Sequence, residues 1–237
     1  MCRLTYPSFR HVLYGCDGMT SDQQLKTGTT TIGLVNKEGV VLASERRATM
    51  GNVIAHKDVQ KVYRIDENLG LTTAGLVGDA QLLARYIKAE VELYRLKRGV
   101  SISVKSASTL LSNILHRGGG SMGFYYVGLI MGGVDKSGGH VYSLDAAGGS
   151  IRDDYVTVGS GSLFAYGVLE DNYEKGMTMD QSVDLAIRAL NAAMKRDSAS
   201  GDGMAVVCIN KDGYRELNDD EIRKKATKLG IDYPKTR

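Results

Sequence analysis

A glycine followed by three threonines is the feature of this sequence with the clearest chemical meaning. Gly28 precedes Thr29, Thr30 and Thr31, and an apolar stretch follows. If the chain were cut after Gly28, Thr29 would carry both a hydroxyl nucleophile and a free α-amino group, whose pKa of about 8 suits a base at neutral pH. Threonines are also common at the start of a β-strand. Taken alone, the tripeptide favours the ordinary strand and leaves the cleavage site open.

Other polar residues along the chain could complete such a site without a histidine. Glu45 ends the second expected strand, and Lys61 precedes the next pair of strands. Ser160 lies in a glycine-rich turn, while Asp197 and Ser200 follow a long helical pattern. Each of these residues alone is typical of a surface or a helix end. Together they supply a carboxylate, a cation and three polar partners for a nucleophile.

Metal and disulfide chemistry find little support in the sequence. The cysteines Cys2, Cys16 and Cys208 have no C-x-x-C spacing, and the four histidines are scattered singly. Neither a zinc site nor a serine–histidine triad is indicated, so we expect no metal site. Cys208 lies in an apolar run and is expected to be a buried small hydrophobe.

Two glycine-rich motifs could be mistaken for nucleotide or anion sites. Gly118-x-Gly120-x-x-Gly123 follows a helical pattern and precedes a strand, the reverse of the dinucleotide-binding order, and therefore predicts a loop. Residues 158–162, Val-Gly-Ser-Gly-Ser, lead from a strand into a helix. They could bind an anion or cap the helix through Ser162, and the motif alone favours the cap.

Composition is that of a soluble globular domain of 237 residues with a net charge of +3. No apolar run approaches the roughly 20 residues that span a bilayer, and the N-terminal stretch lacks the hydrophobic region of a secretory signal. We therefore expect a cytoplasmic protein without a membrane partner. Removing residues 1–28 takes away three basic and two acidic side chains and leaves +2, which indicates no nucleic-acid partner. The basic cluster at residues 223–228 is expected to be the solvated face of a helix.

Hydrophobic periodicity and turn signals predict the elements that position these residues. The expected strands span residues 30–36, 40–45, 61–65, 69–74, 124–134, 140–145, 150–152 and 154–158, with two more before the last helix. Helices are expected at residues 82–96, 104–115, 163–173 and 222–229. A further helix is expected to begin at the capping box Thr178-x-x-Gln181. Their order predicts an α+β fold in which two antiparallel sheets pack face to face with helices outside.

From Thr29 to about Leu217 the chain resembles β subunits of the 20S proteasome, of the archaeal type. The motifs that carry the resemblance occur in the family's order and spacing. They are residues 28–31 (GTTT), 43–52 (ASERRATMGN), 74–80 (AGLVGDA), 145–149 (DAAGG) and 196–201 (RDSASG). The resemblance implies the four-layer αββα fold of N-terminal nucleophile hydrolases, with residues 29–237 as a single catalytic domain. Residues 1–28 would be a propeptide removed by autocatalytic cleavage between Gly28 and Thr29.

The resemblance further implies a threonine-type endopeptidase that needs no metal or organic cofactor. Thr29 would be the nucleophile and its own α-amino group the general base. Lys61 would lie near the hydroxyl and amine, with Glu45 paired to it. The residues expected to orient the amine are Ser160, Asp197 and Ser200.

Substrate contacts follow from the same resemblance. The backbone N–H of Gly75 would face the oxyanion, and Thr49 together with Gly75 would hold the substrate backbone as an added strand. Ala48, Thr73 and Val77 correspond to the pocket for the side chain before the scissile bond. Because none of these pocket residues is charged, apolar side chains are expected there.

The implied partners are identical β subunits in a seven-membered ring, rings of a different α subunit, a regulatory ATPase and unfolded polypeptide substrates. The chain departs from the family in carrying Glu45 where many members have aspartate. Residues 1–28 show no resemblance, and Met19 could be the true start. Two rivals remain: the related bacterial two-component protease, whose loop motifs differ, and a structural β subunit that builds the ring without cutting.

Overall fold

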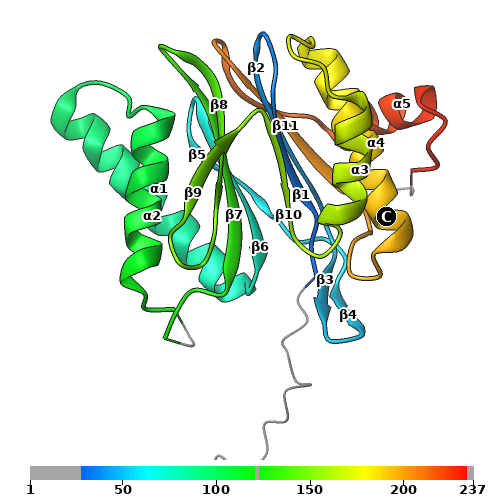
Figure 1. Ribbon diagram of the computed structural model, residues 1–237, viewed down its shortest axis with the longest axis horizontal. Helices are drawn as coiled ribbons and strands as arrows, with labels where there is room; N and C mark the ends of the chain where they lie inside the picture. Colours follow the sequence, from blue (N-terminus) through cyan, green and yellow to red (C-terminus); the bar gives the residue numbers. More distant parts are fainter. Residues whose placement is uncertain (1–27, 121–122, 234–237) are drawn as a thin grey trace, which may run out of the picture.

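The computed structural model describes residues 28–120 and 123–233, and two five-stranded antiparallel sheets form its centre (Figure 1). The first sheet contains β1 (Thr31–Val35), β2 (Gly39–Glu45), β10 (Tyr155–Val158), β11 (Met204–Asn210) and β12 (Gly213–Glu216), in the order β10-β1-β2-β11-β12. The second contains β5 (Val62–Asp66), β6 (Leu69–Gly75), β7 (Val127–Asp135), β8 (Gly138–Leu144) and β9 (Ser150–Asp153), in chain order. A separate hairpin is made by β3 (Ala48–Met50) and β4 (Val53–His56).

Apolar side chains from both sheets meet in a shared core. All seven residues of β2 are buried, as expected for a strand covered on both faces. Val40 and Leu42 of β2 pack in one cluster with Ile130 and Val141 of the second sheet. Gly33 on β1 keeps this interface close, because an added Cβ would lie 2.8 Å from Ile130 Cγ2 and 2.9 Å from Val141 Cγ1.

Helices cover the outer face of each sheet, as Figure 1 shows. The helices α1 (Val77–Arg98) and α2 (Val104–Arg117) pack through a cluster that includes Leu83, Leu111 and Leu129 on the second sheet. The first sheet is covered by α3 (Ser162–Asn172), α4 (Met179–Arg196) and α5 (Asp219–Lys228), with Ile32 and Leu190 in their shared cluster. The α+β expectation of two antiparallel sheets with helices is therefore confirmed.

Most of the expected elements are present within a few residues of their expected ends, and α4 begins at the predicted capping box of Thr178 and Gln181. The β3–β4 hairpin was not predicted, because all four residues of β4 are exposed and show no apolar alternation. The glycine motif at 118–123 lies between α2 and β7, as predicted, although residues 121–122 fall outside the described chain.

One local prediction is wrong, and another holds for only part of its segment. The N-cap of α3 is Gly161 without a side-chain cap, and Ser162 is the first helical residue. Within the basic cluster at 223–228, Lys224 and Lys228 are exposed as expected. Lys225 is only partly exposed, because its Nζ donates to Asp184 Oδ1 at 2.7 Å and to Asp180 Oδ1 at 2.5 Å on α4. Lys225 therefore helps to hold α5 against α4.

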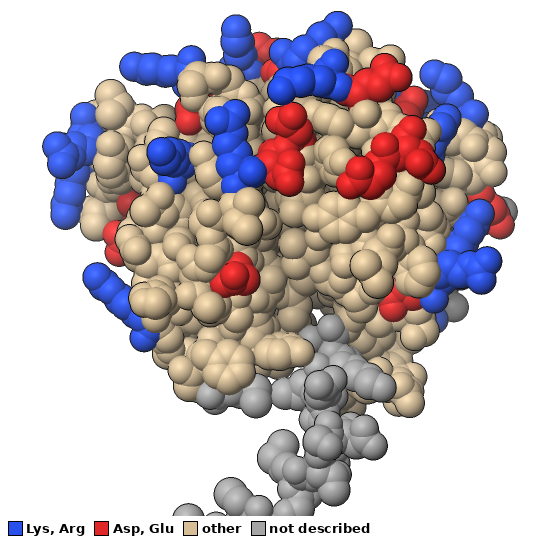
Figure 2. Space-filling view, viewed as in Figure 1, with Lys and Arg blue, Asp and Glu red and all other residues tan. Residues whose placement is uncertain are grey.

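In the view of Figure 2, basic and acidic side chains intermingle and gather at the end of the molecule opposite the β3–β4 hairpin. Within the described residues, no helix combines the length and the apolar character needed to cross a bilayer.

Candidate active site

Thr29 lies two residues before the start of β1, and its side chain is held between a lysine and the preceding peptide group. Thr29 is 4% exposed. Its Oγ1 donates to the carbonyl oxygen of Gly28 at 2.6 Å and accepts from Lys61 Nζ at 3.0 Å. In the uncut chain its nitrogen is an amide, which donates to Ser160 Oγ at 3.1 Å. A hydroxyl, a cation and a peptide carbonyl therefore meet at the predicted junction.

Lys61 and Glu45 form a buried ion pair, 5% and 0% exposed. Lys61 Nζ donates to Glu45 Oε1 and to the carbonyl oxygen of Arg47. The Glu45 carboxylate also accepts backbone N–H groups from Arg47 at 2.7 Å, Gly201 at 3.2 Å and Thr30 at 3.3 Å. These bonds fix the carboxylate, and through it the ammonium, at the end of β2.

Burial acts on both members of this pair by disfavouring their charged forms. It raises the pKa of Glu45 above its ordinary value, although Lys61 and the backbone donors oppose the rise. It lowers the pKa of Lys61, against the attraction of Glu45 and Asp197. Lysine is thereby made more available as a proton acceptor than it would be in water.

The predicted polar partners Ser160, Asp197 and Ser200 form one network beside Thr29. Ser160 Oγ and Ser200 Oγ both donate to Asp197 Oδ2 at 2.6 Å. Ser160 alone of the three accepts from the nitrogen of Thr29. Ser200 instead shares a 2.7 Å hydrogen bond with the hydroxyl of Thr30. The structure thus brings all three residues together and connects Ser200 to Thr29 through Asp197 and Ser160.

One pocket opens beside the Gly28–Thr29 junction, and all the residues expected to contact substrate line it. The expected residues in its lining are Ala48, Thr49, Thr73, Gly75 and Val77, together with Lys61. Residues that the sequence reasoning missed also line it, namely Val59, Gln60, Tyr63 and Ala80. Tyr63 lies two residues after Lys61 in the expected strand at residues 61–65, so strand alternation was a usable signal for it. Val59 and Gln60 precede β5 and carried no such signal.

Gly75 is the one expected substrate contact whose backbone demands glycine. It has a φ of +108°, and an added Cβ would lie 2.3 Å from the carbonyl oxygen of Tyr126. The end of β6 can therefore pass close to the segment before β7, and this brings Gly75 to the pocket wall.

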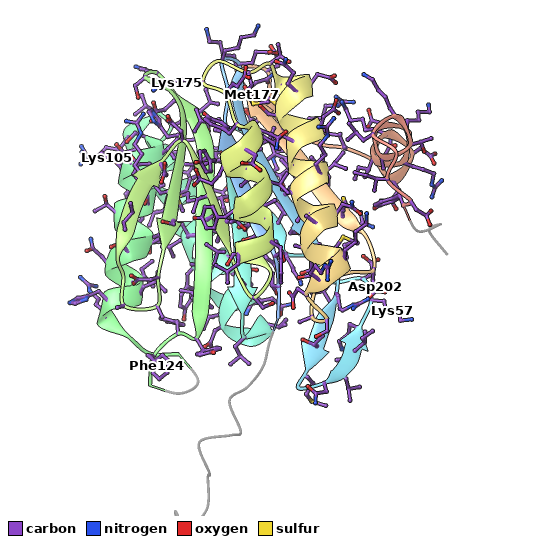
Figure 3. The ribbon with its side chains drawn as sticks, turned by 45° about the vertical axis from the view of Figure 1, so that its right-hand side comes forward. Lys57, Lys105, Phe124, Lys175, Met177 and Asp202 are labelled. Atoms are coloured by element: carbon purple, nitrogen blue, oxygen red, sulfur yellow. The ribbon has the colours of Figure 1, made fainter. Side chains whose placement is uncertain are left out.

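Arg47 belongs to the site, although the sequence reasoning gave it no role. Its Nε donates to Asp202 Oδ2 at 2.6 Å, and its Nη1 donates to the carbonyl oxygen of Ser198 at 2.8 Å. Arg47 therefore ties the end of β2 to the loop after α4, where Figure 3 labels Asp202. No local sequence pattern connects residues so far apart in the chain.

Among the described residues, no group of three histidine, cysteine, aspartate or glutamate side chains is arranged to hold a metal ion. Cys208 is buried, as predicted, and burial raises the pKa of its thiol to about 11.

Fold and site together define a two-sheet α+β protein in which a buried lysine–carboxylate pair contacts a threonine hydroxyl. The family model described as "Proteasome subunit" matches residues 25–209, more than half of the chain, and the chain belongs to this family.

Within that family, the chain is similar to archaeal proteins named "Proteasome subunit beta". It is 55% identical to the protein of Methanosphaerula palustris over 205 residues, which cover 86% of this chain and 96% of the relative. It is 52% identical to the protein of Thermoplasma acidophilum over 211 residues, 89% of this chain and 99% of the relative. These matches confirm the resemblance inferred from the motifs.

Proposed function

We propose that this chain is a catalytic β subunit of the 20S proteasome that cuts itself between Gly28 and Thr29 and then hydrolyses peptide bonds of unfolded proteins. The observation that carries the proposal is the position of Thr29 Oγ1, which lies 3.0 Å from Lys61 Nζ and 2.6 Å from the Gly28 carbonyl oxygen. A nucleophile, a lysine amino group and the carbonyl to be attacked are thus already adjacent.

Self-cleavage would begin with attack of Thr29 Oγ1 on the carbonyl carbon of Gly28. This step needs Lys61 in its neutral form, which the lowered pKa of its ammonium makes more accessible. The hydroxyl proton passes to the neutral amine and from there to the nitrogen of Thr29 as the C–N bond breaks, and Lys61 regains its charge when it takes up a proton again. An ester then links Gly28 to the Thr29 side chain. Water adds to this ester, which releases Gly28 as a carboxylic acid and restores the hydroxyl beside a free amine.

The free α-amino group of Thr29 would serve as general base in the mature enzyme. Lys61, held by Glu45, places a positive charge near this amine and lowers its pKa, so more of it is free base at neutral pH. Ser160 and Asp197, supported by Ser200, orient the amine. Peptide hydrolysis then runs through an acyl ester on Thr29, which water releases.

Substrate would bind along the pocket beside Thr29. Thr49 and Gly75 hold the backbone as an added strand, and the Gly75 N–H faces the oxyanion. Support comes from the chain itself, since the backbone nitrogen of Gly28 donates to Thr49 Oγ1 at 3.2 Å. Ala48, Thr73 and Val77 form the uncharged pocket, which favours apolar side chains before the scissile bond.

The remaining parts of the proposal rest on family membership. Residues 29–237 form one catalytic domain with the four-layer αββα fold of N-terminal nucleophile hydrolases, which the clusters between and outside the sheets support. Residues 1–28 are the propeptide, of which 1–27 lie outside the described chain. The cytoplasmic assembly is a seven-membered ring of identical β subunits that stacks with α-subunit rings, and a regulatory ATPase supplies unfolded substrates.

Intact-mass measurement of the purified, assembled protein tests this proposal. The expected mature chain begins at Thr29, and one that retains Gly28 would overturn the mechanism. The variant Thr29→Ala should remain uncut and inactive towards peptides, whereas Thr29→Ser, which keeps the hydroxyl, should still be cut. Processing of Thr29→Ala would move the nucleophile elsewhere, and an uncut, inactive wild type would favour the structural-subunit alternative.

A further inference from the structure

Gly28 lies against a wall formed by the loop after α4. A Cβ added to Gly28 would lie 1.8 Å from Ala199 Cβ, 3.1 Å from Ala199 Cα and 2.9 Å from Ser160 Oγ. Carbon atoms in contact are normally about 3.5 to 4.0 Å apart, so the distance to Ala199 Cβ is far inside the repulsive range. Any residue other than glycine at position 28 must displace this wall or move away from it.

The wall is held from both sides. The N–H of Ala199 donates to Asp197 Oδ1 at 3.1 Å, and the N–H of Gly201 donates to the buried Glu45 carboxylate at 3.2 Å. Arg47 holds the carbonyl oxygen of Ser198 from the other side. Moving Ala199 outward would therefore strain the same bonds that position Glu45 and Asp197. A displaced Gly28 would instead lose the placement of its carbonyl beside Thr29 Oγ1.

The wall is separate from the substrate pocket. Gly28 and Thr29 line that pocket, but neither Ala199 nor Ser160 does. A side chain at position 28 would therefore point into the wall and not into the apolar substrate pocket. The residue before the self-cleaved bond thus faces a different requirement from the residue before a substrate's scissile bond.

We propose that Ala199 is the residue that restricts the position before the self-cleaved bond to glycine. This inference rests on the proposed self-processing and assigns its specificity to one methyl group on the loop after α4. Ala199 is a specificity-determining residue for self-cleavage, and it takes no part in the chemistry.

The test is a double-mutant cycle followed by intact mass on the full chain, under conditions in which the wild type is cut. Gly28→Ala should slow cleavage at least about tenfold, since overpacking of this kind opposes the attack geometry. In the Ala199→Gly background the same change at Gly28 should cost much less. Some cost remains, because the contacts with Ser160 Oγ and the Cα of residue 199 persist.

Ala147→Gly is a matched control. Ala147 donates its N–H to Asp145 Oδ1 at 2.9 Å, as Ala199 does to Asp197, but it lies on an exposed turn. Combined with Gly28→Ala, it should give no rescue. Because the readout is the ratio of rates within each background, an altered baseline in Ala199→Gly does not obscure the answer.

A second comparison depends on position 28 alone and stands even if Ala199→Gly fails to fold. If the side chain at position 28 meets the wall, Gly28→Leu should be cut no faster than Gly28→Ala. If that side chain entered the apolar pocket instead, Gly28→Leu would be cut faster than Gly28→Ala. Three results would each overturn the proposal. They are faster cleavage of Gly28→Leu than of Gly28→Ala, an equal slowing by Gly28→Ala in both backgrounds, and cleavage of Gly28→Ala at the wild-type rate. An uncut wild type would instead count against self-processing itself.

Discussion

Replacing Lys61 with methionine tests the buried ion pair on which the site depends. Lys61→Met keeps most of the side-chain volume and removes the charge that Glu45 faces. Glu45 is fully buried, so its carboxylate cannot turn to solvent. It keeps its three backbone N–H donors, from Thr30, Arg47 and Gly201. The variant therefore leaves a buried charge without its counter-ion but with part of its hydrogen bonding.

Breaking a buried ion pair from one side typically costs about 3 to 5 kcal/mol of unfolding free energy. The three remaining donors place the expected loss near the lower figure, at about 3 kcal/mol at pH 8. Changing Glu45→Gln as well removes the stranded charge, so the double variant should regain much of this stability. Self-cleavage should be lost in both variants, because Thr29 Oγ1 no longer has its proton acceptor.

The loss of unfolding free energy in Lys61→Met should depend on pH in a defined direction. Burial already raises the pKa of Glu45 above 4.5, and removing Lys61 raises it further because the opposing charge is gone. A carboxyl whose pKa is higher in the folded state favours folding while protonated, and this contribution fades as pH rises through the folded-state pKa. The gap between wild type and Lys61→Met should therefore widen from pH 5 to pH 8.

Urea unfolding at both pH values measures this gap, with Thr29→Ala in every chain so that all are compared uncut. Lys57→Met is the matched control, since Lys57 is exposed after the β3–β4 hairpin (Figure 3) and its replacement should change stability by less than about 0.5 kcal/mol. A loss below about 1 kcal/mol at pH 8, or an equal gap at pH 5 and pH 8, would refute the account of Glu45 as a buried, charged partner.

Three further predictions concern other parts of the molecule. Arg47→Lys loses the forked contact to Asp202 and Ser198. The kcat for peptide hydrolysis should therefore fall with little change in KM, and an unchanged kcat would contradict this prediction. Cys208→Ala should remove a fall in wild-type stability between pH 9 and about 11, because the unfolded thiol ionises first; parallel pH curves would argue against this. Gly33→Val should cost about 1 to 3 kcal/mol in urea unfolding by overpacking the two sheets, and a neutral result would contradict that packing.

Sequence patterns predicted the elements whose burial is periodic and missed those that lack it. The seven buried residues of β2 and the capping box of α4 were readable because local spacing encodes them. The β3–β4 hairpin was missed, because its exposed strands carry no core-facing pattern. It nevertheless supplies Ala48 and Thr49 to the pocket, which only the family resemblance anticipated.

The site shows a different limit. Thr29, Glu45 and Lys61 could be grouped from the sequence by their complementary chemistry, but only the family resemblance gave them roles, since each alone resembles a strand end. Contacts between distant segments were not predictable at all: Gly28 and Ala199 lie together because of how the first sheet and α4 pack on each other. Local periodicity carries no information about such pairs, which depend on the tertiary arrangement.

The Ser160–Asp197 network has a direction that suits both stages of the proposed reaction. Ser160 and Ser200 both give their hydroxyl hydrogens to Asp197 Oδ2. The oxygen of Ser160 therefore presents a lone pair to the nitrogen of Thr29, whose N–H it accepts. When cleavage converts that amide into an amine, one N–H can keep the same bond while the nitrogen lone pair becomes free to take the nucleophile's proton. In the proposed reaction the base is thus created beside a Ser160–Asp197 network that is already organised.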